Sequence, residues 1–288
     1  MKQIFLYSIF GLSVGAMVFF TMTFLSETNN IKQGQAFYEN LSIEIIQNQF
    51  DEYSSSVTDK AKSLPKTKLD SEIFIIQDSN NGEFQTIEIE SKEDEAPPIF
   101  KSFIDFDTMR GNYPDIVAWI KAENLNYPIV QGIDNNYYLS RLPNSKHHVM
   151  GSIFLDYRNL EDFSEQTIIL YGHDSRKGDM FGSLKYYASQ EYYEQNSSVL
   201  IFTPKCDYNL MLIAGYIIDS AFEVPPMNFI DPEDFEQYIA DIKNRSIFKS
   251  KSDIEVNYGD QLVYLATCIS SGSINDRLII VGKLEIYV

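Results

Sequence analysis

Two short apolar runs near the end of the chain constrain its fold more than any other feature. Residues 261–268 are rich in residues typical of β-strands, and the run ends on Cys268. A short polar loop follows, and Arg277 then opens a second run of the same kind. Far upstream, residues 168–173 form a third apolar run, which ends on His173. If each run is a strand, a thiol, a guanidinium and an imidazole lie at strand ends. Such a set can perform acyl transfer, because a nearby cation favours the reactive thiolate.

Composition narrows the class of protein. The chain has 288 residues, of which 44% are hydrophobic, enough for one sizeable core with appendages. Its 20 Phe and 19 Tyr are typical of a β-rich fold, and its net charge of −18 argues against nucleic acid as a partner. Two cysteines, Cys206 and Cys268, do not make a disulfide framework, and a catalytic thiol must stay free. No metal-ligand spacing occurs, so we expect neither a metal nor another cofactor.

The N-terminus predicts a membrane anchor. Residues 4–25 are apolar and long enough, at about 1.5 Å per residue, to cross a bilayer core of about 30 Å. No clear cleavage site follows, so we expect an uncleaved signal anchor. Lys2 precedes the run and Glu27 follows it, which predicts a short cytoplasmic segment, residues 1–3, and an extracytoplasmic body.

Two regions follow the expected anchor. Residues 26–98 are predicted to form a helical and acidic stalk or linker, with helical spacing over 35–50 and a candidate hairpin over 72–89. An ordered spacer and a disordered linker are both compatible with this composition. Residues 99–288 are predicted to form one compact domain.

Within that domain, alternating apolar runs bounded by turn residues predict strands. They cover residues 126–130, 153–157, 167–171, 199–203, 209–219, 261–267 and 277–287. Helices are predicted over 100–120, with a break near 111–114, over 179–188 and over 232–244. The last has the clearest start, because Asp231 is a favourable N-cap and Pro232 fits the first turn. Many strands with few helices predict a closed or nearly closed β-barrel.

Several motifs in order resemble class B sortases. Tyr264-Leu265-Ala266-Thr267-Cys268 with Arg277 resembles the sortase signature, a Thr-Leu-x-Thr-Cys strand followed by an arginine on the next strand. Residues 171–173 with 180–184 resemble the histidine region of class B members, and residues 119–139 and 151–159 resemble their opening. The predicted helix over 232–244 resembles the extra helix that class B members carry before the cysteine strand. The resemblance covers about residues 99–288.

The resemblance implies a fold and a set of roles. The fold is mainly β, a closed barrel of about eight strands with N-terminal helices and the extra helix. Cys268 is implied as the nucleophile, His173 as the general acid and base, and Arg277 as the donor to the oxyanion or the substrate backbone. Thr267 and Leu265, on the strand of the nucleophile, are candidate substrate contacts.

The resemblance also implies a reaction and a place. A membrane-anchored transpeptidase of a Gram-positive cell surface would cleave the C-terminal sorting motif of secreted proteins and transfer them to an amine of a peptidoglycan precursor. Three alternatives stay open: a pilin-polymerising sortase, a thiol peptidase that only hydrolyses, and a non-enzymatic surface scaffold.

Several residues near these motifs depart from the family pattern or compete with the predicted site residues. Tyr264 replaces the first threonine of the signature, and we expect it to point away from the cysteine. Ser270 stands where some class B members have an acid, which leaves Asp276 as a weak candidate for a third catalytic member. His147 and His148 lie in a polar loop and are predicted to be surface residues.

Overall fold

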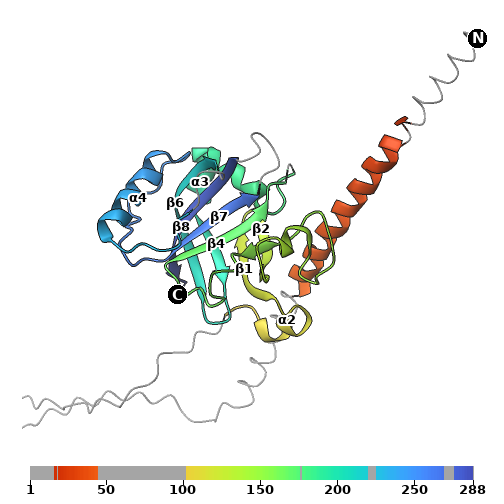
Figure 1. The fold of residues 1–288 in the computed structure, drawn as a ribbon, viewed down its shortest axis with the longest axis horizontal. Helices are drawn as coiled ribbons and strands as arrows, with labels where there is room; N and C mark the ends of the chain where they lie inside the picture. The colour runs from red at the N-terminus through yellow and green to blue at the C-terminus, as the bar shows by residue number, and fades with distance from the viewer. Residues whose placement is uncertain are drawn as a thin grey trace, which may run out of the picture.

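The chain folds into a closed β-barrel flanked by helices (Figure 1). The structure is a computed structural model that describes residues 16–17, 19–44, 102–175, 177–219, 225–268 and 276–287. Its strands are β1 (Ile116–Ala122), β2 (Leu125–Gln131), β3 (Ile153–Leu155), β4 (Thr167–His173), β5 (Ser198–Phe202), β6 (Asp207–Asp219), β7 (Leu262–Cys268) and β8 (Asp276–Ile286). They are hydrogen-bonded in the order β1-β2-β3-β4-β7-β8-β6-β5, and β5 closes the barrel on β1. The predicted barrel is confirmed.

Strands β4, β7 and β8 form one continuous part of the wall. β4 and β7 run parallel and are paired over their full lengths, from Thr167 with Leu262 to His173 with Cys268. β8 runs antiparallel to β7 on its other side. Alternate residues of β7, such as Val263 and Leu265, enter the core inside the barrel, while their neighbours pack outside it. Burial on both faces explains why these runs are almost continuously apolar.

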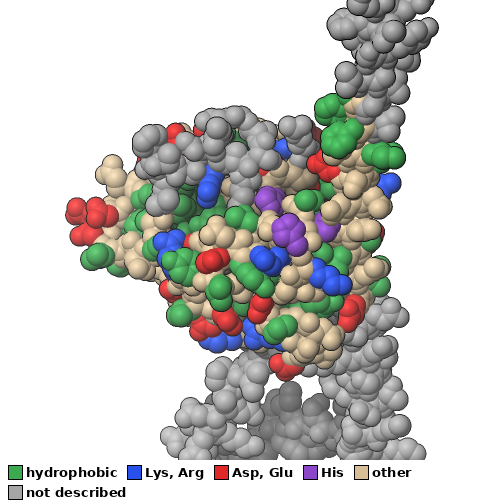
Figure 2. All heavy atoms as spheres, turned by 45° about the vertical axis from the view of Figure 1, so that its right-hand side comes forward, with side chains coloured by type: hydrophobic (Ala, Val, Ile, Leu, Met, Phe, Trp, Pro, Cys, Tyr) green, Lys and Arg blue, Asp and Glu red, His purple; other side chains and the backbone are tan. Residues whose placement is uncertain are grey.

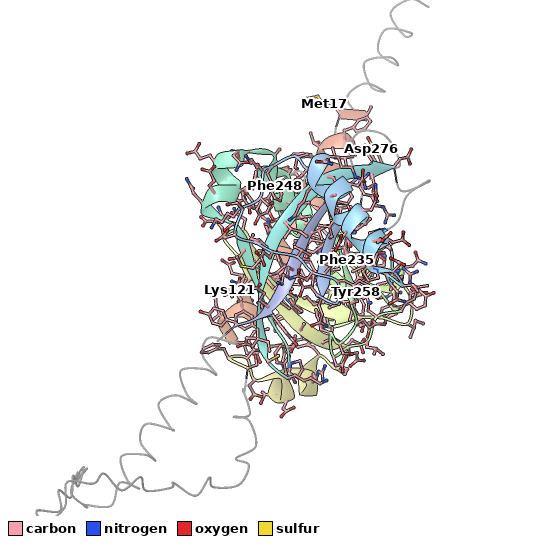
Figure 3. All side chains as sticks on the ribbon, turned by 90° about the vertical axis from the view of Figure 1, so that its left-hand side faces the viewer. Met17, Lys121, Phe235, Phe248, Tyr258 and Asp276 are labelled. Atoms are coloured by element: carbon pink, nitrogen blue, oxygen red, sulfur yellow. The ribbon has the colours of Figure 1, made fainter. Side chains whose placement is uncertain are left out.

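Five short helices flank the barrel in the described part of the chain. They are α2 (Phe106–Asn112), α3 (Gln190–Gln195), α4 (Pro232–Asn244) and the 3₁₀ helices η1 (Tyr137–Ser140) and η2 (Phe181–Ala188). α4 begins as predicted, since the Asp231 side chain accepts a hydrogen bond from the Glu233 amide. It packs on the outer face of the sheet, and Phe235 contacts Tyr258 edge to face at 5.9 Å between ring centroids (Figure 3).

The predicted helix over residues 100–120 is wrong in its second half. Only α2 is helical there, and residues from Ile116 onward form β1. Pro114 disfavours a helix across this point. The run that follows is rich in β-branched and aromatic residues, and it is buried between β2 and β5. Tertiary pairing therefore decides the state of this segment.

A long N-terminal helix, residues 19–44, leans on the barrel on the side away from α4 (Figure 1). Tyr38 and Leu41 are buried against the barrel, so this part of the predicted stalk belongs to the folded body. Among the described residues no helix is long and apolar enough to cross a membrane. Most of the predicted anchor, residues 4–15 and 18, lies outside the described residues, as do the linker over 45–98 and its candidate hairpin.

Candidate active site

The ends of β4 and β7 bring two of the predicted reactive residues side by side. His173 and Cys268 are the last pair of the parallel ladder between these strands. The β7–β8 ladder pairs Ala266 with Ile279, and the same register continued by two residues sets Cys268 opposite Arg277. Thr267 supports this continuation, because its hydroxyl accepts a hydrogen bond from the Leu278 amide at 3.0 Å. His173, which is far from Cys268 and Arg277 in the sequence, thus meets them at one edge of the barrel wall.

Strand alternation assigns these positions to one face of the sheet. Tyr264 and Ala266 of β7 lie on the outer face together with Ile279 and Val281 of β8. Because residues i, i+2 and i+4 of a strand share a face, positions 268 and 277 lie on that face too. The expectation that Tyr264 faces away from the cysteine is therefore wrong: it lies on the same face, four residues before position 268, and is fully buried.

Arg277 offers a donor that no described part of the protein uses. Its Nε is buried and has no hydrogen-bond partner among the residues that the structure describes. A buried donor without a partner is costly unless a ligand satisfies it. Arg277 also lies near Tyr171: burial and the Asp156 carboxylate raise the pKa of Tyr171, and the charge of Arg277 acts to lower it. The guanidinium is thus held at the edge of the site with an available N–H.

His173 is oriented by a backbone carbonyl. Its ring nitrogen Nε2 lies 2.5 Å from the carbonyl oxygen of Leu139 in η1. Since a carbonyl only accepts, Nε2 carries a proton in this arrangement, and Nδ1 is the nitrogen left to exchange protons. No carboxylate among the described residues is hydrogen-bonded to His173. Asp276 is exposed at the start of β8 and pairs across the ladder with Asp219 (Figure 3). Ser270 lies outside the described residues.

A buried acid beside the site was missed by the sequence analysis. Asp156 has a fully buried side chain, which receives two hydrogen bonds from the Arg158 guanidinium, both at 2.8 Å, and one from the Tyr171 hydroxyl at 3.1 Å. Burial acts to raise the pKa of Asp156, but hydrogen bonds from Arg158 and Asn135 outweigh it and lower the pKa overall. The signal in the sequence was the close spacing of Asp156 and Arg158 directly after a buried apolar run.

The remaining predicted residues are placed as follows. Leu265 is fully buried inside the barrel, so it has no surface to offer a peptide, and its position contradicts the predicted substrate contact. Thr267 is 5% exposed and its hydroxyl is engaged by the Leu278 backbone, which makes it a support of the strand end. Cys206 has a free thiol.

The surface prediction for His148 is wrong, whereas His147 is exposed as predicted. His148 is only 7% exposed, because the N-terminal helix covers it. Figure 2 shows that histidine side chains gather on one face of the molecule, close to that helix. In the described part of the chain, no group of three or more His, Cys, Asp or Glu side chains could hold a metal ion.

Comparison with known proteins agrees with this geometry. Sortase B of Listeria monocytogenes is 30% identical over 173 residues, which are 59% of this chain and 70% of that protein. Sortase B of Staphylococcus aureus is 31% identical over 183 residues, 62% of this chain and 74% of that protein. The solved S. aureus sortase B–substrate complex superposes with a TM-score of 0.60 at 29% identity, covering 64% of this chain and 85% of that one. No family profile matches the chain. By fold, by site geometry and by these relatives, the chain belongs to the sortase B family.

Proposed function

We propose that this protein is a cysteine transpeptidase that cleaves a C-terminal sorting motif of secreted proteins and transfers them to an amine of a peptidoglycan precursor. The observation that carries the proposal is the strand register, which pairs His173 with Cys268 and continues to Arg277. The S. aureus relative solved as a complex with its substrate supports the same kind of peptide substrate here.

Each residue has one role in the proposed reaction. His173 first takes the proton of the Cys268 thiol on Nδ1, so that both ring nitrogens carry a proton. The Cys268 thiolate then attacks the scissile carbonyl carbon, and the carbonyl oxygen gains the negative charge, which the buried Nε–H of Arg277 stabilises. The tetrahedral intermediate collapses to a thioester, and His173 gives a proton from Nδ1 to the leaving amine. In the second half, His173 takes the proton of the incoming amine as that amine attacks the thioester, and the thiolate of Cys268 is released.

The proposed location is the outer face of a Gram-positive membrane, in which the apolar N-terminus anchors the chain. The described end of the N-terminal helix supports this placement, because Phe19, Phe20 and Phe24 are between 67% and 71% exposed. Exposed aromatic side chains in such number are unfavourable in water and fit an apolar environment.

A peptide assay on the full-length chain tests the proposal. A library of peptides that carry candidate sorting motifs is incubated with the protein and an excess of an oligoglycine or a lysine-containing peptide, and products are identified by mass spectrometry. We expect an amine adduct and, on stopping the reaction early, a thioester on Cys268. Cys268→Ala should abolish both products, while Cys206→Ala, the matched control at the other cysteine, should retain them.

Other outcomes would separate the alternatives. Hydrolysis without any adduct would favour a thiol peptidase, and preference for a pilin lysine over a cross-bridge amine would favour pilin polymerisation. Absence of cleavage with every peptide, together with alkylation of Cys268 no faster than a free thiol, would contradict an enzymatic role.

A further inference from the structure

The carbonyl that orients His173 belongs to a segment that is packed from two sides. Leu139 lies in η1, and just before this helix Asp134 Oδ1 accepts hydrogen bonds from the Asn136 and Tyr137 amides, both at 2.8 Å. Behind η1, the Ser152 amide donates to the Tyr138 carbonyl at 3.0 Å. Residues 148–152 therefore form a support that packs against η1, the helix that carries the Leu139 carbonyl.

Gly151 is the closest part of that support. It adopts a φ of 57°, a left-handed conformation that favours glycine. A Cβ at this position would collide with the Leu139 carbonyl oxygen and lie 2.8 Å from the Tyr138 carbonyl oxygen. The backbone of Gly151 thus lies against the Leu139 carbonyl, which holds the His173 imidazole.

The N-terminal helix contacts the same support, residues 148–152, from outside the barrel. The Tyr38 hydroxyl donates to the Gly151 carbonyl at 2.6 Å and lies 3.1 Å from the Ser152 hydroxyl. The His148 ring bridges helix and support: Nδ1 accepts from the Met150 amide at 3.2 Å, so Nε2 carries the proton and donates to the Asn30 carbonyl at 2.8 Å. Gly34 allows this close approach, because a Cβ there would overlap the His148 ring and lie 2.6 Å from Met150 Sδ.

The helix also contacts the segment on the other side of His173. Gln35 donates to the Asp179 carboxylate at 3.0 Å. Asp179 belongs to the turn that follows β4 and that the backbone bridge between Asp174 and Met180 closes. Contacts from a single helix therefore reach the chain both before and after the catalytic histidine.

We propose that residues 30–41 of the N-terminal helix, the docked segment, are a positioning element for the catalytic histidine. The docked segment holds Gly151, Gly151 holds the Leu139 carbonyl, and that carbonyl keeps the proton of neutral His173 on Nε2 and leaves Nδ1 for the reaction. The inference rests on the proposed role of His173 for its kinetic consequence, but the tautomer of the ring can be measured without turnover.

Two substitutions in the N-terminal helix weaken its contacts with residues 148–152 and change no residue of the barrel. Gly34→Ala strengthens the helix itself, because alanine has the higher helix propensity, yet its methyl group wedges the helix away from His148 and Met150. Tyr38→Phe keeps the ring and removes only the hydroxyl that holds Gly151. The matched controls are Gly111→Ala, where nothing lies within 4 Å of the new methyl group, and Tyr193→Phe, which loses a buried hydroxyl-to-carbonyl bond to Leu212.

The first measurement is nitrogen NMR of the full-length chain labelled with ¹⁵N-histidine. The chain has only 3 histidines, so His173 is assigned by the signal that disappears in His173→Gln. At a pH where the ring is neutral, we expect the Nε2–H tautomer of His173 in the wild-type chain and in both controls. In Gly34→Ala and Tyr38→Phe, we expect the Nδ1 and Nε2 shifts to move toward each other as both tautomers become populated.

The second measurement is steady-state transpeptidation. Misplacement of a catalytic group lowers the rate of the chemical step, so both docking variants should lose about tenfold to a hundredfold in kcat with KM changed less than about twofold. An unchanged His173 tautomer in both docking variants, or a kcat loss no greater than in the controls, would overturn the inference. If the wild-type chain has no transpeptidase activity, the proposed function fails, and the NMR result still decides whether the helix positions His173.

Discussion

The strands β4, β7 and β8 and the docked segment of the N-terminal helix shape the same site by different means. The strands place His173, Cys268 and Arg277 through a continuous backbone ladder, and most of the residues in that ladder are fully buried. The docked segment acts through a few side-chain contacts, chiefly those of Tyr38 and Gln35. Position in the site is therefore fixed by the barrel, whereas the orientation of the imidazole depends on groups outside it. Changes to the strands should affect stability and activity together, and changes to the helix mainly activity.

The largest effect is expected at the strand end that carries the guanidinium. Arg277→Ala should lower kcat by about 10²–10³, the loss seen when one oxyanion donor is removed. Arg277→Lys keeps the charge but lacks the planar fork of donors, so it should recover only part of the rate. Steady-state kinetics of both variants measure this, with Arg110→Ala as a control that removes a guanidinium bonded to the Ile116 carbonyl. Full activity of Arg277→Ala would exclude Arg277 from the chemistry.

A change inside β4 tests the coupling of stability and activity. A Cβ on Gly172 would lie 2.8 Å from two ring atoms of Phe181 in η2, so Gly172→Ala must push η2 away from the strand. Overpacking of this kind costs about 1–3 kcal/mol of unfolding free energy, and it should also displace the neighbouring His173. Urea unfolding and kinetics on the same sample give both effects, and Gly111→Ala should show neither. A stable but inactive Gly172→Ala would contradict the expected coupling.

The buried acid beside the strands predicts a pH dependence. Because the folded state lowers the pKa of Asp156, its contribution to stability is fully present above the unfolded value of about 3.9 and is lost as the pH falls through the folded pKa. Asp156→Asn should lower the unfolding free energy at neutral pH by about 1–2 kcal/mol, a modest value because Arg158 is half exposed.

Unfolding curves measured from pH 7 down to pH 2 test the Asp156 prediction. The difference in stability between the wild-type chain and Asp156→Asn should shrink steadily below about pH 3.9. A difference that stays constant over this range would mean that the ionisation of Asp156 does not contribute to stability.

The smallest effect is expected at the edge of the docked segment. Gln35→Ala removes one partly buried hydrogen bond to Asp179, worth about 0.5–1.5 kcal/mol, and should lower kcat by no more than about twofold because Tyr38 and Gly34 still dock the helix. Gln190→Ala in α3 loses more side-chain bonds, one to Glu194 and two to the Lys249 backbone, and should still leave kcat unchanged. An equal loss of kcat in both variants would mean that the helix has no special relation to the site.

Much of the barrel could be predicted from local pattern. Strands β4, β7 and β8 were located within two residues of their ends because they are apolar, β-type runs between polar turns, and α4 was located because Asp231 and Pro232 mark its start. β1 was predicted as helix, since a short apolar run buried on both faces has no periodicity that separates strand from helix. Its pairing with β2 and β5 settles the question.

The site, like the barrel, has residues that local pattern predicts and others that only tertiary contacts place. Cys268, His173 and Arg277 could be named as candidates because each stands at the end or start of an apolar run. His148 was placed on the surface because its neighbours are polar, and nothing local indicates that residues more than 100 positions earlier cover it. The role of the Leu139 carbonyl could not be predicted either, because a backbone group has no signature in the sequence.

The sequence alone determined which reactive groups the chain carries and which strands bear them, because strand-forming and capping preferences act between near neighbours. The tertiary structure decided that β4 lies beside β7 in parallel, which sets His173 beside Cys268. It also decided that the N-terminal helix reaches the support of the Leu139 carbonyl. Both depend on contacts between distant segments, whose free energy comes from packing and burial in the assembled fold and not from any local stretch of residues.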